Sequence, residues 1–359
     1  MKVAIIGGGA CGLVLANVLQ DNQIEYEIFE KSLVGRKILA SGNGKANLAN
    51  LNIFPSAYNT LFGYKLVKNY QTRLFDFFKS IHLLTKHDEE GRIYPYSESS
   101  LTVLNCLLKK QLKIVENFPV QSITVVNHKY YINNVRGPFD YIVLATGSMA
   151  SFIPKKQEGF YSYLDSMHLP VQKPIPSLVG FQLDCDFKRL SGVRVKCMAT
   201  LMQQDEVMYQ ESGEVILKAD GISGICILNL SSMYARLKDK TNCFISLDLV
   251  PNLKIENVED LGGILHPKLV EYFKNETDVL EKIHNFKFKI KNVYDFEFAQ
   301  VVSGGVPIEE VNENLTLKGN PHILIGGELL DVDGICGGYN LMFAFCCGLK
   351  IGDYLCSIK

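Results

Sequence analysis

The sequence predicts an α/β protein with a parallel β-sheet at its centre, because three segments far apart in the chain have the pattern of buried strands that end at glycines. The first is "KVAII" at 2–6, the second is "DYIVLATGS" at 140–148, and the third is "HILIGGE" at 322–328. Nearly continuous apolar runs of this length are typical of strands covered on both faces. The chain of 359 residues is long enough for two or three domains.

The composition is that of an ordinary globular protein with a sizeable core, with 47% hydrophobic and 21% charged residues. Lysine and arginine number 37 against 38 acidic residues, so the formal net charge is −1. This balance argues against a nucleic-acid-binding surface, although a local basic patch could be hidden in the total. We therefore expect no nucleic-acid partner, and the sequence indicates no oligomeric state.

The cysteines and the N-terminal run exclude several classes of protein. None of the ten cysteines forms a C-x-x-C pair, so we expect free thiols in a reducing cytosol and no metal site. Lys2 and the apolar run after it could begin a signal peptide, but three consecutive glycines interrupt the run and no convincing cleavage site follows. No apolar run reaches the roughly 18 residues that cross a bilayer. The sequence predicts a soluble, cytoplasmic protein without a membrane partner.

The first thirty residues form a unit of strand, glycine turn, helix, strand and acid. Gly7, Gly9 and Gly12 fit G-x-G-x-x-G, and "LVLANVL" continues with helical spacing. In such a unit the first glycine permits a tight turn, the second lets the backbone approach a pyrophosphate, and the third allows close packing of helix on strand. Glu30 ends the second strand, where its carboxylate can accept hydrogen bonds from ribose hydroxyls. The unit predicts a dinucleotide site that prefers FAD or NAD over NADP, and the alternative is a glycine-rich turn without a ligand.

The stretch "GRKILASGNGKANLAN" at 35–50 is too rich in small residues for a core helix and too irregular for a strand, so we expect a loop. It follows the second strand almost at once, and ligands in open α/β sheets bind beyond the carboxyl ends of the strands. Arg36 and Lys37 can offset the charge of a diphosphate. Residues 41–44 and Asn47 can offer backbone and amide groups to a flat ring. The alternative is a solvated surface loop.

The strand, glycine turn and helix pattern occurs again near the C-terminus. "HILIGGE" is followed by "DVDGICGGYN" at 331–340 and then by an apolar helix in which Gly348 and Gly352 allow close packing. Between the two ends of the chain, 145–147 marks another strand that runs into a glycine. FAD is long, and flavoproteins commonly hold its two halves with segments distant in sequence, whereas a nicotinamide site rarely needs such a return. FAD is therefore preferred over NAD.

Together, "GGGACG", "GRKILASGNGKAN", "LATGS", "GISG", "SGGV" and "GGELLDVDGICGGYNL" resemble the NAD(P)/FAD-dependent oxidoreductases of the bile-acid-reductase or aminoacetone-oxidase-like type. The resemblance covers nearly the whole chain in order, and a wider similarity extends to glutathione-reductase-like and fumarate-reductase-like flavoproteins. It implies a Rossmann-like FAD-binding domain made of 1–157 and 299–359, interrupted by an inserted, mainly β domain at 170–298. It also implies an FAD-dependent oxidoreductase whose flavin is reduced by NAD(P)H and reoxidised by a small-molecule substrate.

The resemblance further implies how the chain holds FAD. Glu328 would contact the ribityl chain, and the N-terminus of the last helix would face N1 and O2 of the flavin, where its dipole favours negative charge. The loop at 42–47 is expected to lie against the isoalloxazine ring. Asp331 and Asp333 could instead order their turn by Asx-type hydrogen bonds. With the motifs above, the residues expected to bind FAD are Gly7, Gly9, Ala10, Cys11, Gly12, Glu30, Lys31, Gly35, Arg36, Lys37, Ser41, Gly42, Asn43, Gly44, Asn47, Val120, Ala145, Thr146, Gly147, Gly327, Glu328, Asp333, Gly338, Tyr339, Asn340 and Leu341.

The catalytic residues are not indicated by any motif. Asn47 and Tyr94 are the two candidates, and we expect Tyr94, in a loop at 89–100 together with Tyr96, to pack rather than to donate a proton. The chain has Lys45-Ala46 where members of the family usually carry Arg-Cys, so the resemblance does not indicate the substrate. Two other functions remain: a flavin-dependent tRNA-modifying enzyme, which the net charge of −1 disfavours, and a non-catalytic FAD-binding redox sensor.

Overall fold

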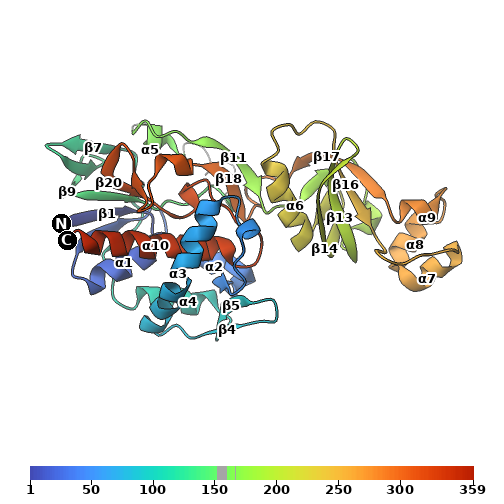
Figure 1. Ribbon diagram of the computed structural model, residues 1–359, viewed down its shortest axis with the longest axis horizontal. Coiled ribbons are helices and arrows are strands. Elements are labelled where there is room, and N and C mark those ends of the chain that lie inside the picture. Colours follow the sequence, from blue (N-terminus) through green and yellow to red (C-terminus); the bar gives the residue numbers. More distant parts are fainter. Residues whose placement is uncertain (152–159, 166) are drawn as a thin grey trace. The chain divides into compact units, whose positions relative to one another are not determined.

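The computed structural model describes residues 1–151, 160–165 and 167–359 (Figure 1). These residues form two compact units, and the chain leaves the first unit and later returns to it. The first unit contains Met1–Met149, Gly304–Lys359 and the described part of 155–174; the second contains Ile175–Ser303 with Ala150 and Ser151.

The predicted division into a cofactor domain and a substrate domain stays a prediction, because compactness alone does not assign a function to either unit. The predicted boundary at residue 157 lies outside the described residues.

The first unit is built on a six-stranded sheet in which the N-terminal strand, β1 (Lys2–Ile6), lies near the middle. β1 pairs in parallel with β2 (Glu25–Phe29) on one side and with β10 (Tyr141–Leu144) on the other. β20 (Asn320–Ile325) continues the parallel sheet beside β10, so a late segment of the chain completes a sheet begun by the first residues. The outer strands are β6 (Ile114–Val115), parallel beside β2, and β19 (Thr316–Leu317), antiparallel beside β20. The prediction of an α/β, Rossmann-like fold is confirmed.

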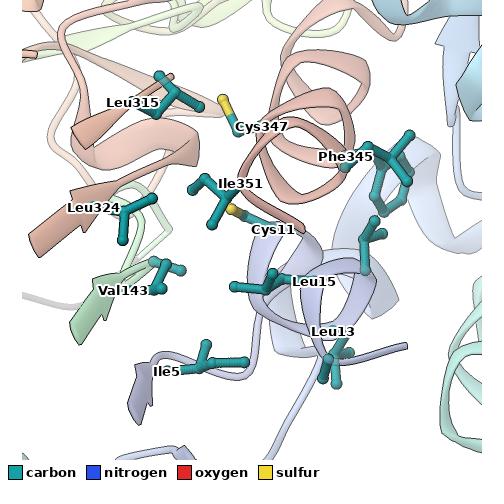
Figure 2. Packing of buried hydrophobic residues seen from close by; sticks show 14 of the residues in the cluster. Ile5, Cys11, Leu13, Leu15, Val143, Leu315, Leu324, Phe345, Cys347 and Ile351 are labelled. Atoms are coloured by element: carbon teal, nitrogen blue, oxygen red, sulfur yellow. The ribbon is translucent and has the colours of Figure 1, made fainter. Parts of the chain in front are cut away.

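The first and last helices of this unit, α1 (Ala10–Asp21) and α10 (Tyr339–Ser357), pack against each other beside the sheet (Figures 1 and 2). A Cβ atom on Gly348 would lie 2.5 Å from the carbonyl oxygen of Cys11, and one on Gly352 would lie 2.7 Å from Cγ1 of Val18. Any larger residue would therefore push the helices apart, as expected for the two glycines. Figure 2 shows the buried side chains of both helices meeting those of β1, β10 and β20 in one core.

Smaller elements surround this core. Two three-stranded antiparallel sheets have the strand orders β7-β8-β9 and β3-β5-β4. Their strands are β7 (Ile123–Val126), β8 (Lys129–Ile132), β9 (Arg136–Phe139), β3 (Ala49–Asn50), β5 (Arg92–Pro95) and β4 (Thr85–His87). The remaining helices are α2 (Arg36–Ala40), α3 (Leu61–Ser80), α4 (Ser100–Leu108) and α5 (Ser162–Asp165). Short 3-10 turns are η1 (Ser41–Gly44), η2 (Pro55–Ala57), η6 (Ile308–Glu310) and η7 (Gly327–Leu329).

The second unit is a closed antiparallel barrel with the strand order β12-β15-β14-β13-β16-β17. Its strands are β12 (Phe181–Leu183), β13 (Arg194–Gln203), β14 (Glu206–Lys218), β15 (Gly221–Ser223), β16 (Cys243–Asp248) and β17 (Phe286–Val293). Alternate side chains of these strands fill an apolar core of their own. Its helices and 3-10 turns are α6 (Ile225–Ala235), α7 (Leu261–Ile264), α8 (Pro267–Phe273), α9 (Val279–Lys282), η4 (Lys188–Leu190) and η5 (Val258–Asp260). The prediction of an inserted, mainly β part of the fold is confirmed.

Two strands carry the chain between the units and pair with each other. They are β11 (Gln172–Ser177) on the way out and β18 (Val301–Gly305) on the way back. All ten cysteines are free thiols. In the part of the chain that the structure describes, no helix has the length and apolar character needed to cross a bilayer, and no group of three metal-ligating side chains occurs.

Candidate functional site

The turn between β1 and α1 is shaped by three glycines with different constraints. Gly7 has a φ of +111°, and a Cβ atom there would lie 2.4 Å from the carbonyl oxygen of Ala145. A Cβ on Gly12 would lie 2.1 Å from the carbonyl oxygen of Gly7, so only glycine allows α1 to begin this close to β1. A Cβ on Gly9, the N-cap residue of α1, would meet no described atom within 4 Å. The helix N-terminus therefore opens onto free space, where a pyrophosphate binds in this type of turn.

Glu30 directly follows β2, and three hydrogen bonds fix its carboxylate beside the glycine turn. Oε2 accepts from the backbone nitrogen of Gly8 at 2.9 Å. Oε1 accepts from the backbone nitrogen of Ser32 at 3.0 Å and from its Oγ at 3.2 Å. A carboxylate has about four lone-pair sites, so one further hydrogen bond can be accepted in this position. The geometry fits the predicted role of accepting a hydrogen bond from a ribose hydroxyl.

An ion pair joins two of the predicted FAD-binding residues from opposite ends of the chain. Lys37 Nζ lies 2.6 Å from Glu328 Oε2 and 2.9 Å from Ser148 Oγ, which itself lies 3.2 Å from the same carboxylate oxygen. A Cβ on Gly147 would lie 3.7 Å from Glu328 Oε2, so the end of β10 borders the pair. The two side chains are 34% and 18% exposed, and their attraction is less screened than that of a surface pair. Helix α2, the end of β10 and the 3-10 turn η7 thus meet at one cluster of polar groups.

The stretch 35–50 contains a short helix, so the prediction of a loop is wrong for its first part. Arg36–Ala40 form α2, preceded by Gly35 in a left-handed conformation with φ of +70°. Ile38 is fully buried and anchors the helix to the core. One buried side chain in five residues makes no helical period, which is why the sequence pattern missed it. The chain then forms the 3-10 turn Ser41–Gly44, in which Gly42, Asn43 and Gly44 have positive φ and no residue is buried.

Asn47 links this stretch to the N-terminus of α10. Its amide oxygen faces the backbone nitrogen of Gly338 at 3.3 Å, and its amide nitrogen faces the carbonyl oxygen of Ala49 at 3.2 Å, which is the orientation that satisfies both groups. Gly338 has a φ of +98°, and a Cβ there would lie 2.4 Å from the same carbonyl oxygen. The two segments predicted to face the flavin therefore lie against each other. Asn47 supports the start of α10 through its side chain.

Asn47→Ala should lower the free energy of unfolding by about 1 kcal/mol, because the N–H group of Gly338 loses its acceptor. The rate of flavin reduction should change more than the affinity for FAD, since the helix start moves and the adenosine side does not. Denaturant unfolding and anaerobic stopped-flow reduction measure the two effects. Asn47→Asp retains the acceptor for Gly338 but places a carboxylate oxygen against the carbonyl oxygen of Ala49, so it should restore only part of the stability. An alanine variant with wild-type stability and reduction rate would refute the supporting role.

The side chains at the start of α10 hold the turn before the helix. Asn340 Oδ1 accepts from the backbone nitrogen of Gly334 at 2.7 Å, and its Nδ2 donates to the carbonyl oxygen of the same residue at 2.8 Å. The Tyr339 hydroxyl donates to the carbonyl oxygen of Asn52 at 2.7 Å. Tyr339 and Asn340 thus use their side chains within the protein. The predicted contact of Tyr339 and Asn340 with the flavin stays a prediction.

The two aspartates of the same turn are buried. Asp331 Oδ1 accepts from the backbone nitrogen of Gly304 at 2.9 Å and so ties the turn to β18. The backbone nitrogen of Asp333 donates to Oδ1 of Asn59 at 3.0 Å. Asp331 therefore has a structural role, and the contribution of Asp333 to FAD binding stays a prediction.

Tyr94 lies on strand β5, so the prediction of a loop at 89–100 is wrong for this part. The strand is held on both sides, by β4 and by β3. Tyr94 is half-buried, and this burial raises its pKa, so its hydroxyl is protonated at neutral pH. Tyr96 is 67% exposed at the end of the strand. Neither tyrosine has a hydrogen bond to the Lys37–Glu328 pair among the described residues.

Three polar residues close to the predicted site were not anticipated from the sequence. Ser148 bonds the Lys37–Glu328 pair and directly follows the predicted turn, so adjacency alone could have indicated it. Tyr163 lies with its hydroxyl 2.7 Å from Thr146 Oγ1. The hydroxyl of Tyr161 is buried in the same unit. The two tyrosines belong to no recognisable sequence motif, because they are separated in the chain from the glycine turn that follows β10. Val120 lies half-buried against the core of this unit.

Proteins of similar sequence cover this chain over nearly its whole length. A 3-dehydro-bile acid Δ(4,6)-reductase of Clostridium scindens is 28% identical, with 98% of each chain covered. A ribosomal RNA dihydrouridine synthase of Haemophilus influenzae is 26% identical, with 97% of each covered. The ribosomal RNA dihydrouridine synthase of Escherichia coli is 23% identical, with 95% of this chain and 94% of that protein covered.

Solved structures show the same fold at low sequence identity. An open conformation of a flavocytochrome c3 fumarate reductase has a TM-score of 0.50 at 13% identity and covers 99% of this chain and 78% of that one. A 3-ketosteroid Δ1-dehydrogenase from Sterolibacterium denitrificans has a TM-score of 0.53 at 9% identity, with 99% of each chain covered. A family model described as "HI0933-like protein Rossmann domain" matches residues 1–354. Because that match spans almost the whole sequence, the chain belongs to the HI0933-like protein Rossmann domain family.

Proposed function

We propose that this FAD-dependent oxidoreductase reduces a carbon–carbon double bond conjugated with a carbonyl group in a small molecule, with NAD(P)H as the electron donor. The observation that carries the proposal is that whole-length relatives are named for reductions of this kind. They are a 3-dehydro-bile acid Δ(4,6)-reductase and two ribosomal RNA dihydrouridine synthases. These reductions share one feature, because a 3-oxo steroid with a Δ4 bond and a uracil ring both contain a carbon–carbon double bond conjugated with a carbonyl group.

The residues of the first unit fit FAD. Gly9 leaves open space at the N-terminus of α1, where free N–H groups and the helix dipole favour a pyrophosphate. Glu30 retains capacity for a ribose hydroxyl beside the same turn. Lys37 places a cation next to Glu328 where the pyrophosphate and ribityl parts are expected. When bound, FAD would supply the transfer of hydride between a donor and an acceptor.

The chain's own residues would position the cofactor and shape its charge. The first N–H groups of α10, whose start Asn47 and Gly338 hold, would favour negative charge on a flavin bound beside them. The Lys37–Glu328 pair presents one cation and one acceptor together, which suits a cofactor with an anionic pyrophosphate and a hydroxylated ribityl chain. No described side chain is assigned the proton transfer to substrate.

The protein should bind FAD at least about tenfold more tightly than FMN, because FMN lacks the adenosine that the turn and Glu30 would hold. Isothermal titration of the apoprotein with each flavin measures the ratio. Riboflavin, without any phosphate, serves as the control for binding of the ring alone. Equal affinities for FAD and FMN would contradict the assignment of the N-terminal unit to the adenosine half.

The reaction is tested by anaerobic reduction of the purified holoprotein with NADH and with NADPH, followed by oxidation with candidate acceptors. We expect rapid bleaching of the flavin by one nicotinamide, and reoxidation by enones such as 3-oxo-Δ4 and 3-oxo-Δ4,6 steroids. Saturated 3-oxo steroids are matched controls that cannot accept hydride at a double bond. Reoxidation by oxygen alone, with no effect of any enone, would refute the proposed acceptor class. Failure of both nicotinamides would refute the proposed donor.

A second candidate substrate is uridine in ribosomal RNA, favoured by the two dihydrouridine synthases among the relatives. The near-neutral charge, 37 basic against 38 acidic residues, counts against a large RNA surface. The two substrates are separated by offering undermodified ribosomal RNA and small enones to the same reduced protein. Dihydrouridine formation in RNA with no enone turnover would favour the RNA reaction. A flavin that is never turned over by either acceptor would favour a redox sensor.

A further inference from the structure

The second unit contains a cavity that the proposed function does not use. Between β16 and β17 the chain leaves the barrel and forms η5, α7, α8 and α9 (Figure 1). The three helices have only four, seven and four residues, so they cannot cover one another completely. They leave a cavity of about 650 Å³ that is open to solvent, within the range of about 300–1,000 Å³ typical of small-molecule sites. Its lining residues are Val258, Leu261, Val270, Phe273, Lys274, Glu276, Asp278, Val279, Leu280 and Glu281.

The most buried lining residues give the cavity an apolar floor. Phe273 is 1% exposed and Val279 is 8% exposed. The ring of Phe273 has its centre 5.2 Å from that of Phe286, the first residue of β17 and a member of the barrel core. The floor is therefore supported by the barrel and exists before any ligand arrives. Apolar surface of this kind, left in contact with water, favours the binding of an apolar body.

The charged groups that line the cavity are only partly neutralised. Lys274 pairs with Glu271 at 3.5 Å, and Glu276 pairs with Lys282. Asp278 and Glu281, in contrast, have no ion pair within the described residues. They lie three residues apart at the start of α9, so their carboxylates project from the same side of the helix. The cavity thus has an excess of negative charge on one side.

The Asp278 carboxylate is not used by the helix that it precedes. Asp278 occupies the N-cap position of α9, where an aspartate usually accepts a hydrogen bond from the first turn. Here its side chain makes no such bond. The surrounding segment, 254–282, carries seven acidic and four basic residues, so its field also favours a cation. The carboxylate remains available to a positively charged ligand.

We propose that this cavity binds a small organic cation with an apolar body, of the alkylammonium or arylalkylammonium class. The apolar body lies on Phe273 and Val279, and the ammonium group lies beside the carboxylates of Asp278 and Glu281. The described residues contain no group of three metal-ligating side chains, so a metal ion is not the ligand that fits. All residues expected to bind FAD belong to the first unit, so the site is independent of the cofactor and of the proposed function.

The ligand class is tested by isothermal titration of the purified protein with phenylbutylammonium, phenylbutanol and phenylbutanoate. These probes share an apolar body and differ in charge. The ammonium should bind about tenfold more tightly than the alcohol, because it gains two partly solvated ion pairs, and the carboxylate should bind more weakly than either. Methylammonium, which lacks the apolar body, should show no saturable binding. Equal affinities for the ammonium and the carboxylate, or no saturable binding of the ammonium, would overturn the proposal.

The location is tested by Asp278→Asn/Glu281→Gln, which should weaken binding of phenylbutylammonium about five- to tenfold and leave that of phenylbutanol unchanged. Both side chains are exposed, and asparagine tolerates the left-handed conformation of residue 278, so the melting temperature should not change. Asp205→Asn/Glu206→Gln is the matched control, because it makes the same change in charge at the turn between β13 and β14, which does not line the cavity. The control should bind the ammonium as the wild type does. Equal weakening by the two double variants would mean that net charge attracts the cation, and the assigned cavity would be wrong.

Discussion

Gly9→Val should reduce FAD affinity by about 100-fold or more while leaving the apoprotein folded, because several charge-assisted hydrogen bonds at the helix N-terminus would be lost together. Gly9 has a φ of −89°, which any residue can adopt. Its Cβ would meet no described atom within 4 Å, so the valine side chain would occupy only the space through which a pyrophosphate approaches. The free energy of unfolding should change by no more than about 1 kcal/mol. Titration calorimetry and thermal unfolding of the apoprotein measure the two quantities.

Two other glycines provide matched controls for this substitution. Gly319, in the turn between β19 and β20, is equally open, and Gly319→Val should alter neither stability nor FAD affinity. Gly12→Val should prevent folding, since even a Cβ would lie 2.1 Å from a backbone oxygen. Native FAD affinity in Gly9→Val would show that the pyrophosphate does not lie over α1, and the site would then have to be assigned elsewhere in the unit.

Lys37→Met should weaken FAD binding by about 30- to 100-fold, the second large effect that the structure predicts. The substitution removes a cation near the expected pyrophosphate and leaves the Glu328 carboxylate, which is 18% exposed, without its ion pair. An unpaired, partly buried carboxylate would then repel the anionic cofactor. Glu328→Gln should cost less, because it removes an acceptor without creating a lone charge.

A double-mutant cycle distinguishes this explanation from a general loss of structure. Lys37→Met/Glu328→Gln should bind FAD more tightly than Lys37→Met alone, because the repulsive carboxylate is gone. Lys110→Met is the control: it breaks a surface pair with Asp21 at 2.5 Å and should leave FAD affinity unchanged. Strictly additive effects of the two site substitutions would mean that the ion pair does not act as a unit in binding.

The parts of the fold that the sequence predicted are those with strong local signals. β1, its glycine turn and α1 follow one another within about twenty residues, and each glycine has a steric reason that a sequence pattern encodes. The apolar run before Gly326 and the long helix α10 were predictable for the same reason. The steric constraints on these glycines involve residues that are close in sequence or that belong to a known sequence motif.

The features that the sequence did not predict depend on contacts between distant segments. The ion pair of Lys37 with Glu328 forms because α2 and η7 meet at the end of β10. No local sequence pattern predicts this meeting. The side-chain bonds of Asn47 at the start of α10 have the same origin. Helix α2 and strand β5 were missed because each is too short to show a period. Tyr161 was missed because an unpartnered hydroxyl is defined only by what surrounds it.

The close packing of α1 against α10 sets an order of events during synthesis. A ribosome makes β1, α1 and β2 first, the barrel strands between 181 and 293 next, and β20 and α10 after them. The barrel is complete in its own stretch of chain, so it can fold while translation continues. The parallel sheet cannot be completed until β20 has been synthesised. Helix α1 likewise cannot pack against α10 until α10 has been synthesised. We therefore expect the nascent chain to carry a folded barrel beside an unfinished sheet, and to take up FAD only after the segment containing α10 has left the exit tunnel.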